Sequence, residues 1–239
     1  MKIIAIDSSS QVASVAILTD DIITAEYTVN HKITHSQTLM PMLDEVVRMT
    51  ETDLSTVDAI AVSGGPGSFT GLRIGSATGK GLAQALDIPI IHIPTLEGMA
   101  YNAYGFDGII CPIMDARRSQ VYTGIYSFSD GEMEVLMDGC AISIEELVER
   151  IKDFDVEILF IGDGIPVFKE YLISRLSDRA VFAPANMNRQ RAASVAALAA
   201  KYYEQGLTVE ACEHLPEYFR SSQAEREREA KLLKEKNVD

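Results

Sequence analysis

The chain has 239 residues, with 21 Lys and Arg against 35 Asp and Glu, so its formal net charge is -14. This charge excludes a large nucleic-acid footprint formed by the chain alone, because phosphate binding needs clustered Lys and Arg. No run approaches the roughly 18 apolar residues of a membrane span, and Asp7 interrupts the N-terminal apolar stretch before a signal-peptide core forms. Three cysteines, odd in number and far apart, predict reduced thiols in a cytoplasmic protein.

The first hundred residues predict three short strands, followed by alternating helices and strands. The β-branched content and the short connections favour an antiparallel meander for the first three strands. Leu39, Leu43 and Val46 then recur at helical spacing. In chain order we expect strands at 2–6, 12–18 and 22–29, a helix at 36–50, a strand at 58–63, a helix at 72–86, a strand at 89–93 and a helix at 95–104.

The second half predicts the same order of elements. Ser143 and Glu146 form a capping-box pattern that opens a helix. We expect strands at 109–114, 119–128 and 132–142, a helix at 143–151, a strand at 156–162, a helix at 167–176, a strand at 180–184 and a helix at 192–205. The order βββαβαβα therefore occurs twice, which predicts a duplicated α/β fold with two lobes.

Residue patterns repeat together with the elements, at an offset of about 100 residues. Asp7 and Gln11 after the first strand are echoed by Asp115 and Gln120. The Gly-Gly-Pro turn after the strand at 58–63 is echoed by a Gly-Asp-Gly turn in the second half. We therefore expect a first lobe at 1–106, a second lobe at 107–214 and a charged, helical tail at 215–239.

A glycine-rich loop at 64–71 is the most specific motif of the chain. It follows a strand and opens a helix, where unsatisfied amides favour an anion, and Ser68 or Thr70 can cap that helix. It is not a P-loop, because Leu-Arg stands where Lys-Ser/Thr is required. Gly65, Gly67 and Ser68 are therefore candidate phosphate-binding residues, and the alternative is a tight strand-to-helix turn.

Small polar or acidic residues follow the first strand of each half. Asp7, Ser8 and Ser9 end the first strand, and Asp115 ends its equivalent in the second half. In a two-lobed nucleotide-binding fold these turns face each other across a cleft. Hydroxyls beside backbone amides suit a phosphate, and an acid suits a metal-bound water. The alternative is ordinary turn chemistry at the end of a strand.

The helix after the glycine loop carries Gly71, Gly75 and Gly79 at four-residue spacing. Each interior glycine destabilises a helix by about 0.5–1 kcal/mol relative to Ala, so the stripe indicates close approach of another backbone. The approaching group is either the protein's own sheet or a helix of another chain.

His31 and His35 stand four residues apart, a spacing that could begin a metal site. No third ligand accompanies them in the sequence, so we expect capping or partner-facing histidines and no metal. The sequence shows no Ser/His/Asp, Cys/His or zinc-type pattern either, and the pair Arg117-Arg118 is interpreted as a surface feature.

Four motifs together resemble the TsaB family, also called YeaZ. They are Ile-Asp-Ser-Ser-Ser at 6–10, Gly-Pro-Gly-Ser-Phe-Thr-Gly-Leu-Arg-Ile-Gly at 65–75, Asp-Ala-Arg-Arg at 115–118 and Pro-Glu-Tyr-Phe-Arg at 216–220. The resemblance covers almost the whole chain, and the motif at 65–75 is the most specific to the family. It implies the two-lobed actin-like and Hsp70-type fold (ASKHA, ribonuclease H-like), in agreement with the repeat.

The resemblance also implies a function in making threonylcarbamoyladenosine, the modified adenosine next to the anticodon of tRNAs that read codons starting with A. A member of the family would be a non-catalytic scaffold or activating subunit. It would pair with the catalytic TsaD subunit, support docking of the small ATPase TsaE, and form homodimers through the same surface. Contact with tRNA would be indirect, through the complex, and no membrane would be involved.

The partner surface implied by the resemblance lies on the two helices that begin near His35 and Leu72. Their apolar and glycine stripes would pack against a partner as a self-complementary four-helix interface. The expected interface residues are His35, Leu39, Met42, Leu43, Val46, Leu72, Arg73, Gly75, Ser76 and Gly79.

Two other functions compete with this interpretation. A stand-alone ATP-dependent phosphotransferase of the same superfamily would use Asp7 and Asp115 in the cleft. A metallopeptidase would use His35 as a zinc ligand, but the metal-binding His pair of TsaD lies elsewhere in the fold and is not carried over to this chain. We expect no firmly bound cofactor, and the sequence leaves open whether ATP or ADP binds in the complex.

Overall fold

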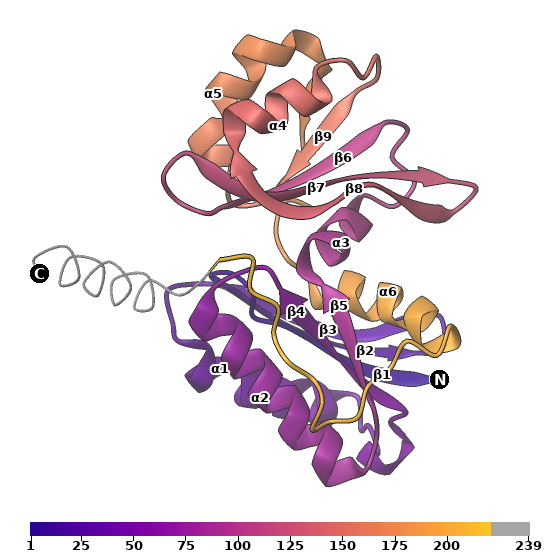
Figure 1. Ribbon diagram of the computed structural model, residues 1–239. Coiled ribbons are helices and arrows are strands. Elements are labelled where there is room, and N and C mark those ends of the chain that lie inside the picture. The colour runs from indigo at the N-terminus through magenta and orange to yellow at the C-terminus, as the bar shows by residue number, and fades with distance from the viewer. Residues whose placement is uncertain (221–239) are drawn as a thin grey trace, which may run out of the picture.

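The computed structural model describes residues 1–220, which fold into two lobes, each built on a five-stranded sheet (Figure 1). The first sheet has the order β3-β2-β1-β4-β5 and the second the order β8-β7-β6-β9-β10. The strands of the first sheet are β1 (Lys2–Asp7), β2 (Val12–Thr19), β3 (Ile22–Asn30), β4 (Ala59–Gly65) and β5 (Ile90–Pro94). Those of the second are β6 (Ile109–Asp115), β7 (Gln120–Ser129), β8 (Glu132–Ser143), β9 (Ile158–Ile161) and β10 (Ala180–Phe182).

The two sheets share one topology. In each, the first three strands form an antiparallel meander. The fourth strand then pairs in parallel with the first, and the fifth pairs in parallel with the fourth. Parallel neighbours need crossover connections, which the intervening helices supply. The duplicated α/β fold predicted from the repeated pattern is therefore confirmed.

Within residues 1–220, six α-helices connect and cover the sheets. They are α1 (His35–Met49), α2 (Phe69–Leu86), α3 (Thr95–Ala100), α4 (Ile144–Ile151), α5 (Ile165–Leu176) and α6 (Ala192–Glu204), with short 3₁₀ turns at Leu54–Thr56, Tyr101–Ala103 and Ser177–Arg179. The side chain of Ser68 accepts a hydrogen bond from the amide of Gly71, so Ser68 and not Thr70 caps α2. The side chain of Ser143 accepts one from the amide of Glu146, which confirms the predicted cap of α4. The helix predicted at 95–104 is shorter, because a 3₁₀ turn replaces its second half.

The first sheet is covered on both faces. Helices α1 and α2 pack on one face around Ile4, Ile6 and Val62, and α6 packs on the other around Ile3, Ala5 and Ile91 (Figure 1). A sheet with parallel strands and two covered faces reads as a continuous apolar sequence, which explains the short apolar runs of β1 and β4.

The position of α6 corrects the predicted lobe boundary, which assigned 107–214 to the second lobe. The amide of Ala192 donates to Ser14 Oγ at 2.8 Å, and that of Ala193 donates to Glu26 Oε1 at 3.1 Å. Both acceptors belong to the first sheet, so the chain returns to the first lobe before α6. Helical periodicity in the sequence locates a helix but does not specify the sheet against which the helix packs.

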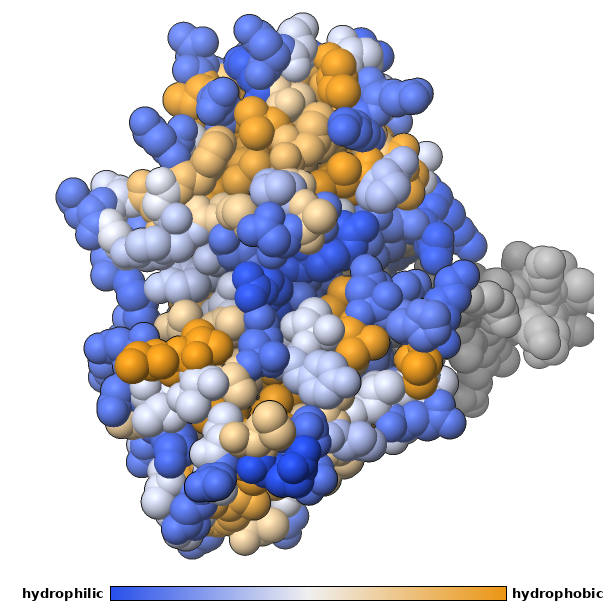
Figure 2. Space-filling model, turned by 180° about the vertical axis from the view of Figure 1, so that it is seen from behind, coloured by the Kyte–Doolittle hydropathy of each residue, from blue (hydrophilic) through white to orange (hydrophobic). Residues whose placement is uncertain are grey.

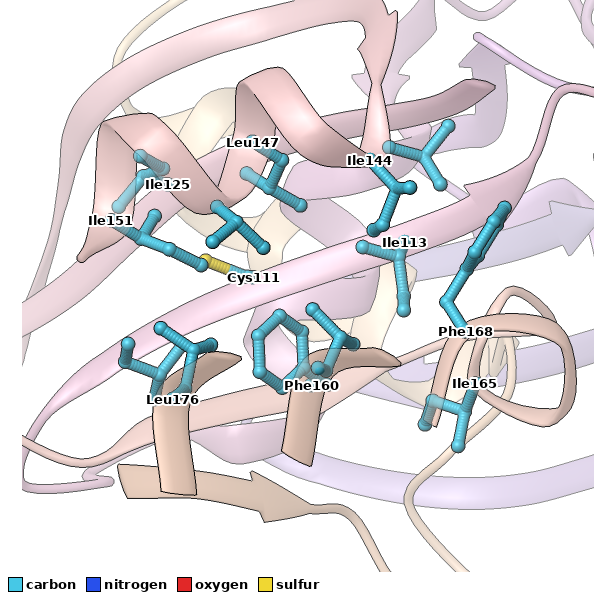
Figure 3. Packing of buried hydrophobic residues seen from close by; sticks show 14 of the residues in the cluster. Cys111, Ile113, Ile125, Ile144, Leu147, Ile151, Phe160, Ile165, Phe168 and Leu176 are labelled. Carbon is cyan, nitrogen blue, oxygen red and sulfur yellow. The ribbon is translucent and has the colours of Figure 1, made fainter. Parts of the chain in front are cut away.

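The second lobe has its own core between its sheet and helices α4 and α5 (Figure 3). Ile144, Leu147 and Ile151 of α4 lie over Cys111 and Ile113 of the central strand β6. Burial raises the pKa of the Cys111 thiol, so this cysteine is an unreactive part of the core.

The opposite face of the second sheet meets the first lobe through α3. Leu96, Met99 and Ala100 of this helix pack with Ile110 and Tyr126 in one buried cluster. The lobes are therefore joined by an apolar contact as well as by the chain itself.

After α6 an extended segment, residues 207–220, runs back along α2 toward the second lobe (Figure 1). We call this segment the strap. The tail predicted at 215–239 thus begins as extended chain, and the helix predicted within it lies outside the described residues. No helix among residues 1–220 combines the length and apolar character needed to cross a membrane.

Candidate functional site

A cleft of about 580 Å³ lies between the lobes. The first lobe contributes the β1–β2 turn, the connection from β3 to α1 and the first turns of α2, and the second lobe contributes the ends of β6 and β9. The lining residues are Ser9, Ser10, Gln11, His31, Lys32, Ile33, Thr34, His35, Gly67, Ser68, Thr70, Gly71, Ile74, Met114, Asp115, Ala116, Arg117, Tyr122 and Asp163. Seen from behind, a mostly hydrophilic band separates the lobes (Figure 2).

The glycine loop between β4 and α2 is packed against other backbone. A Cβ atom on Gly67 would lie 2.2 Å from the carbonyl oxygen of Ser9, and the amide of Ser68 donates to that same oxygen at 2.6 Å. Gly67 and Ser68 line the cleft, as the phosphate interpretation requires. Gly65 does not line it, since its Cβ position lies 2.1 Å from the carbonyl oxygen of Glu217 in the strap. Tight packing thus accounts for both glycines.

Asp7 lies beneath the cleft and does not line it, contrary to the sequence prediction. Its carboxylate accepts hydrogen bonds from the amide of Ser9 at 2.9 Å, from Ser9 Oγ at 2.7 Å and from Ser63 Oγ at 2.6 Å. Burial raises the pKa of the Asp7 carboxyl above its ordinary value, and these hydrogen bonds oppose the rise. The group ties the end of β1 to β4, because each of its oxygens is engaged inside the lobe.

Ser8 is also turned away from the cleft. Its hydroxyl donates to the carbonyl oxygen of Gly71 at 2.9 Å, and a Cβ atom on Gly75 would lie 2.3 Å from it. The side chain therefore seats the first turns of α2 on β1. Of the three polar residues predicted after β1, only Ser9 reaches the cleft.

Asp115 does line the cleft, but its carboxylate is engaged. It accepts hydrogen bonds from the backbone amide of Arg117 at 2.8 Å and from the Arg117 guanidinium at 3.0 Å. Its own amide donates to Asp163 Oδ1 at 3.0 Å. Burial raises the pKa of Asp163, and this hydrogen bond opposes the rise. Asp163 was not among the predicted site residues, although it stands in the Gly-Asp-Gly turn that echoes the glycine loop.

The two histidines at the cleft do not form a metal centre. Nε2 of His35 lies 2.7 Å from the carbonyl oxygen of Ser10, and His31 is exposed. Residues 1–220 contain no group of three or more His, Cys, Asp or Glu side chains that could hold a metal ion. His35 is thus a link between α1 and the β1–β2 turn.

The predicted partner residues are mostly buried within this chain, which corrects their assignment. Leu39, Met42, Leu43 and Val46 belong to the core beneath α1, and Leu72, Gly75, Ser76 and Gly79 face inward from α2. A Cβ atom on Gly79 would lie 2.5 Å from Val62 Cγ2. The glycine stripe therefore serves the protein's own sheet, the first of the two alternatives that the sequence left open.

Two of the predicted partner residues do reach the surface. His35 is half-buried, and Arg73 is exposed, with its Nε donating to the hydroxyl of Tyr218 at 3.1 Å. The outer faces of α1 and α2 also expose residues that the prediction missed, among them Met40, Ala77 and Gly81. A helical wheel could have identified them as the face opposite the apolar stripe.

Comparison with known proteins shows the relationship of this chain. A family model described as TsaD, tRNA N6-adenosine threonylcarbamoyltransferase, matches residues 23–228. The tRNA threonylcarbamoyladenosine biosynthesis protein TsaB of Bacillus subtilis is 35% identical over 228 residues, covering 94% of this chain and 96% of that protein. TsaB of Escherichia coli is 30% identical over 233 residues, with the same coverage of 94% and 96%.

Solved structures give the same result. YeaZ from Pseudomonas aeruginosa superposes with a TM-score of 0.76 at 28% identity, covering 91% of this chain and 99% of that one. The ethanolamine utilization protein EutJ from Carboxydothermus hydrogenoformans shares the fold, with a TM-score of 0.53 at 13% identity over 82% of this chain and 89% of that one. The topology is thus the two-lobed actin-like one, and by sequence and structure the chain belongs to the TsaB (YeaZ) family.

Proposed function

We propose that this chain is a non-catalytic scaffold or activating subunit of the machinery that makes threonylcarbamoyladenosine in tRNA. The identity to TsaB of Bacillus subtilis over nearly the full length of both chains carries the proposal. Its partner is a TsaD-like transferase, which performs the chemistry, and a TsaE-like ATPase docks on the pair. The tRNA contacts the complex rather than this acidic chain alone, and the complex works in the cytoplasm.

The state of the cleft acids supports a non-catalytic role. A phosphotransferase of this fold needs a carboxylate that is free to act on a metal-bound water or a hydroxyl. Here Asp7 is consumed by three internal hydrogen bonds, and Asp115 is paired with Arg117. Asp7 and Asp115, the two acids that the phosphotransferase alternative would use, are therefore both engaged within the chain.

A metallopeptidase is the least supported alternative. Its zinc would need His35, whose Nε2 lies 2.7 Å from the carbonyl oxygen of Ser10, so only Nδ1 is left as a possible ligand. The described part of the chain also offers no set of three metal ligands around it. We therefore place no metal in the proposed function.

We place the partner surface on the outer faces of α1 and α2. Met40 is 52% exposed on α1, and Ala77 and Gly81 are exposed on α2. A Cβ atom on Gly81 would meet nothing within 4 Å, so the fold of this chain gives no reason for a glycine there. Small residues on an outer face let a second helix pair approach closely, which a four-helix interface requires.

The same surface suits two partners. The TsaD family model matches most of this chain, so a TsaD-like transferase shares its fold and carries equivalent helices. A second copy of this chain offers the identical surface, as an isologous dimer requires. The homodimer and the pair with the transferase therefore compete for one surface.

A matched pair of substitutions tests the proposal. Met40→Asp puts a charge into the proposed surface, and Val167→Asp puts the same charge on α5 of the second lobe, at a side chain that is 59% exposed. We expect Met40→Asp to weaken binding to the TsaD-like transferase at least about tenfold, since a charge buried in an interface is left unpaired. Val167→Asp should bind as the unchanged protein does, by titration calorimetry.

The cellular readout is threonylcarbamoyladenosine in tRNA. Bacillus subtilis cells depleted of TsaB and supplied with this chain should recover the modification, and cells supplied with Met40→Asp should recover less of it. Full recovery by a Met40→Asp variant that no longer binds the transferase would overturn the scaffold role. Recovery by neither the chain nor its variants would overturn the function itself.

A further inference from the structure

The strap contacts the first lobe at its own beginning. The amide of Val209 donates to the carbonyl oxygen of Ile90 at 2.9 Å, and the amide of Ile90 donates back at 2.9 Å. This bridge pairs the outward-facing backbone groups of Ile90 at the start of the edge strand β5. The strap then turns along α2, where a pocket of about 360 Å³ lies between Arg73 and Lys80 of the helix and Leu215 of the strap.

The middle of the strap is held by a buried histidine. His214 is 2% exposed, and its Nδ1 lies 2.9 Å from Ser76 Oγ. Lys80 Nζ donates to the carbonyl oxygens of His214 at 3.0 Å and of Cys212 at 3.1 Å. The other ring nitrogen of His214 finds no hydrogen-bond partner within residues 1–220. An unpaired polar atom in such a buried place has a desolvation cost that offsets part of the stability of this contact.

The end of the strap reaches the second lobe. The amide of Glu217 donates to the carbonyl oxygen of Gly64 at 2.7 Å, and the guanidinium of Arg220 donates to the carbonyl oxygen of Ala116 at 2.8 Å. Phe219 packs where Gly139 leaves room, since a Cβ atom there would lie 2.9 Å from its ring. The strap is therefore a third connection between the lobes, beside α3 and the chain crossings.

The charges around His214 oppose a proton on its ring. Lys80 approaches it from α2, and the ring of His92 on β5 lies 5.3 Å away. The pKa of His214 is lowered to about 4, mainly by burial and to a smaller extent by His92 and Lys80. Burial also lowers the pKa of His92, and Glu217 of the strap opposes that shift. Glu217 is thus the acid that faces this pair, and it acts on His92.

We propose that the strap is a latch between the lobes, and that protonation of His214 releases it. With the strap in place, the ring is buried beside His92 and Lys80 and holds the segment on α2. With the strap lifted, the ring enters water, where it accepts a proton at its ordinary pKa. Release would also break the hydrogen bond from Arg220 to the carbonyl oxygen of Ala116, which lines the cleft on the side of the second lobe. The second lobe would then lose its connection to the first lobe through the strap.

The sign of the effect follows from the two states. The lifted strap takes up a proton below pH 6.5, and the latched strap resists it down to about 4, so acid favours release. Between pH 7 and pH 5 these pKa values raise the ratio of lifted to latched strap by about 20-fold.

Hydrogen exchange on the full chain measures the release. The amides of Val209 and Glu217 should lose about 20-fold in protection factor between pH 7 and pH 5, whereas that of Val15 in the centre of the first sheet should not change. His214→Phe keeps an aromatic ring and removes the titration of His214, so the loss of protection between pH 7 and pH 5 should be much smaller, and what remains belongs to His92, whose pKa burial also lowers. His31→Gln changes an exposed histidine and should behave as the unchanged chain.

A second readout needs no change at His214. The chain contains no Trp, so Phe219→Trp gives a single reporter at the lobe-to-lobe contact. Its emission should shift to the red as the pH falls from 7 to 5, and should shift much less when His214→Phe is added. Equal protection at both pH values in the unchanged chain would overturn the latch. A pH dependence as large in His214→Phe as in the unchanged chain would overturn the role of His214. No partner protein is present, so the outcome is separate from that of the proposed function.

Discussion

Two glycines of α2, two residues apart, have opposite surroundings. Gly79 faces the first sheet, where a Cβ atom would lie 2.5 Å from Val62 Cγ2. Gly81 faces outward, where a Cβ atom would meet nothing within 4 Å. In a helix, Ala is more favourable than Gly by about 1 kcal/mol when no contact intervenes. The same substitution should therefore change sign between the two positions.

We expect Gly81→Ala to raise the free energy of unfolding by about 0.5–1 kcal/mol, because it adds helix propensity and no clash. Gly79→Ala should lower it by about 1–2 kcal/mol, because overpacking against Val62 exceeds the gain in propensity. Urea unfolding followed by circular dichroism measures both. Equal shifts in the two variants would show that the sheet does not hold α2 at this distance.

Individual residues also show where sequence reasoning reached its limit. The position of Asp115 at the cleft was predictable, because strand ends follow from apolar runs. The withdrawal of Asp7 was not, because it depends on Ser63, which lies on another strand 56 residues away. The burial of Leu39 was readable as an apolar stripe, but the stripe alone does not say whether a sheet or a partner covers it.

Helix α6 shows how an element is bound to a lobe by its first turn. The unsatisfied amides at a helix N-terminus need acceptors. Ala193 finds one in Glu26 Oε1 at 3.1 Å, and the other carboxylate oxygen of Glu26 pairs with Arg191. Glu26 lies on the edge strand β3, so a side chain of the first sheet caps a helix that follows the whole second lobe in sequence.

Removing this cap should loosen α6. We expect Glu26→Ala to lower the free energy of unfolding by about 1–3 kcal/mol, because the amide of Ala193 loses its acceptor in a half-buried place. Glu26→Gln keeps an acceptor and loses the ion pair with Arg191, which is worth about 1 kcal/mol or less. Urea midpoints for the two variants separate these contributions. A loss as large in Glu26→Gln would assign the effect to charge rather than to capping.

Most elements were predictable because their signals are local. Apolar runs located the ten strands of the described chain to within a few residues, and the caps at Ser68 and Ser143 formed as expected. The attachment of α6 and the course of the strap were not predictable. Both depend on contacts between distant segments, and a helical or polar pattern does not identify the segment that it will contact.

At the scale of the molecule, the first lobe is not a continuous stretch of chain. Its sheet is complete by Pro94, but one apolar face of that sheet is covered only when α6 arrives. The face consists of Ile3, Ala5, Ala16, Leu18, Ala59, Ala61, Ile91 and Ile93, and α6 covers it with Ala192, Val195, Ala196, Leu198 and Ala199. The second lobe is thus an insertion within the first.

A fragment of residues 1–106 should therefore fail to unfold cooperatively, because one face of its sheet is exposed to water. Joining residues 184–220 to it by a flexible linker should restore a cooperative transition, since α6 and the strap then return. Far-ultraviolet circular dichroism during a urea titration distinguishes the two. A cooperative transition in the shorter fragment would mean that the sheet and its two helices suffice.

The loop at 64–68 has a wider consequence for how such chains are recognised. Gly65 and Gly67 each abut a carbonyl oxygen of another segment, that of Glu217 and that of Ser9, and both segments are fixed by hydrogen bonds to the loop. Backbone cannot move aside as a flexible side chain can, so a residue with a Cβ atom would clash at either position. A glycine signature of this kind follows from the close packing of backbone, and it does not by itself assign nucleotide binding.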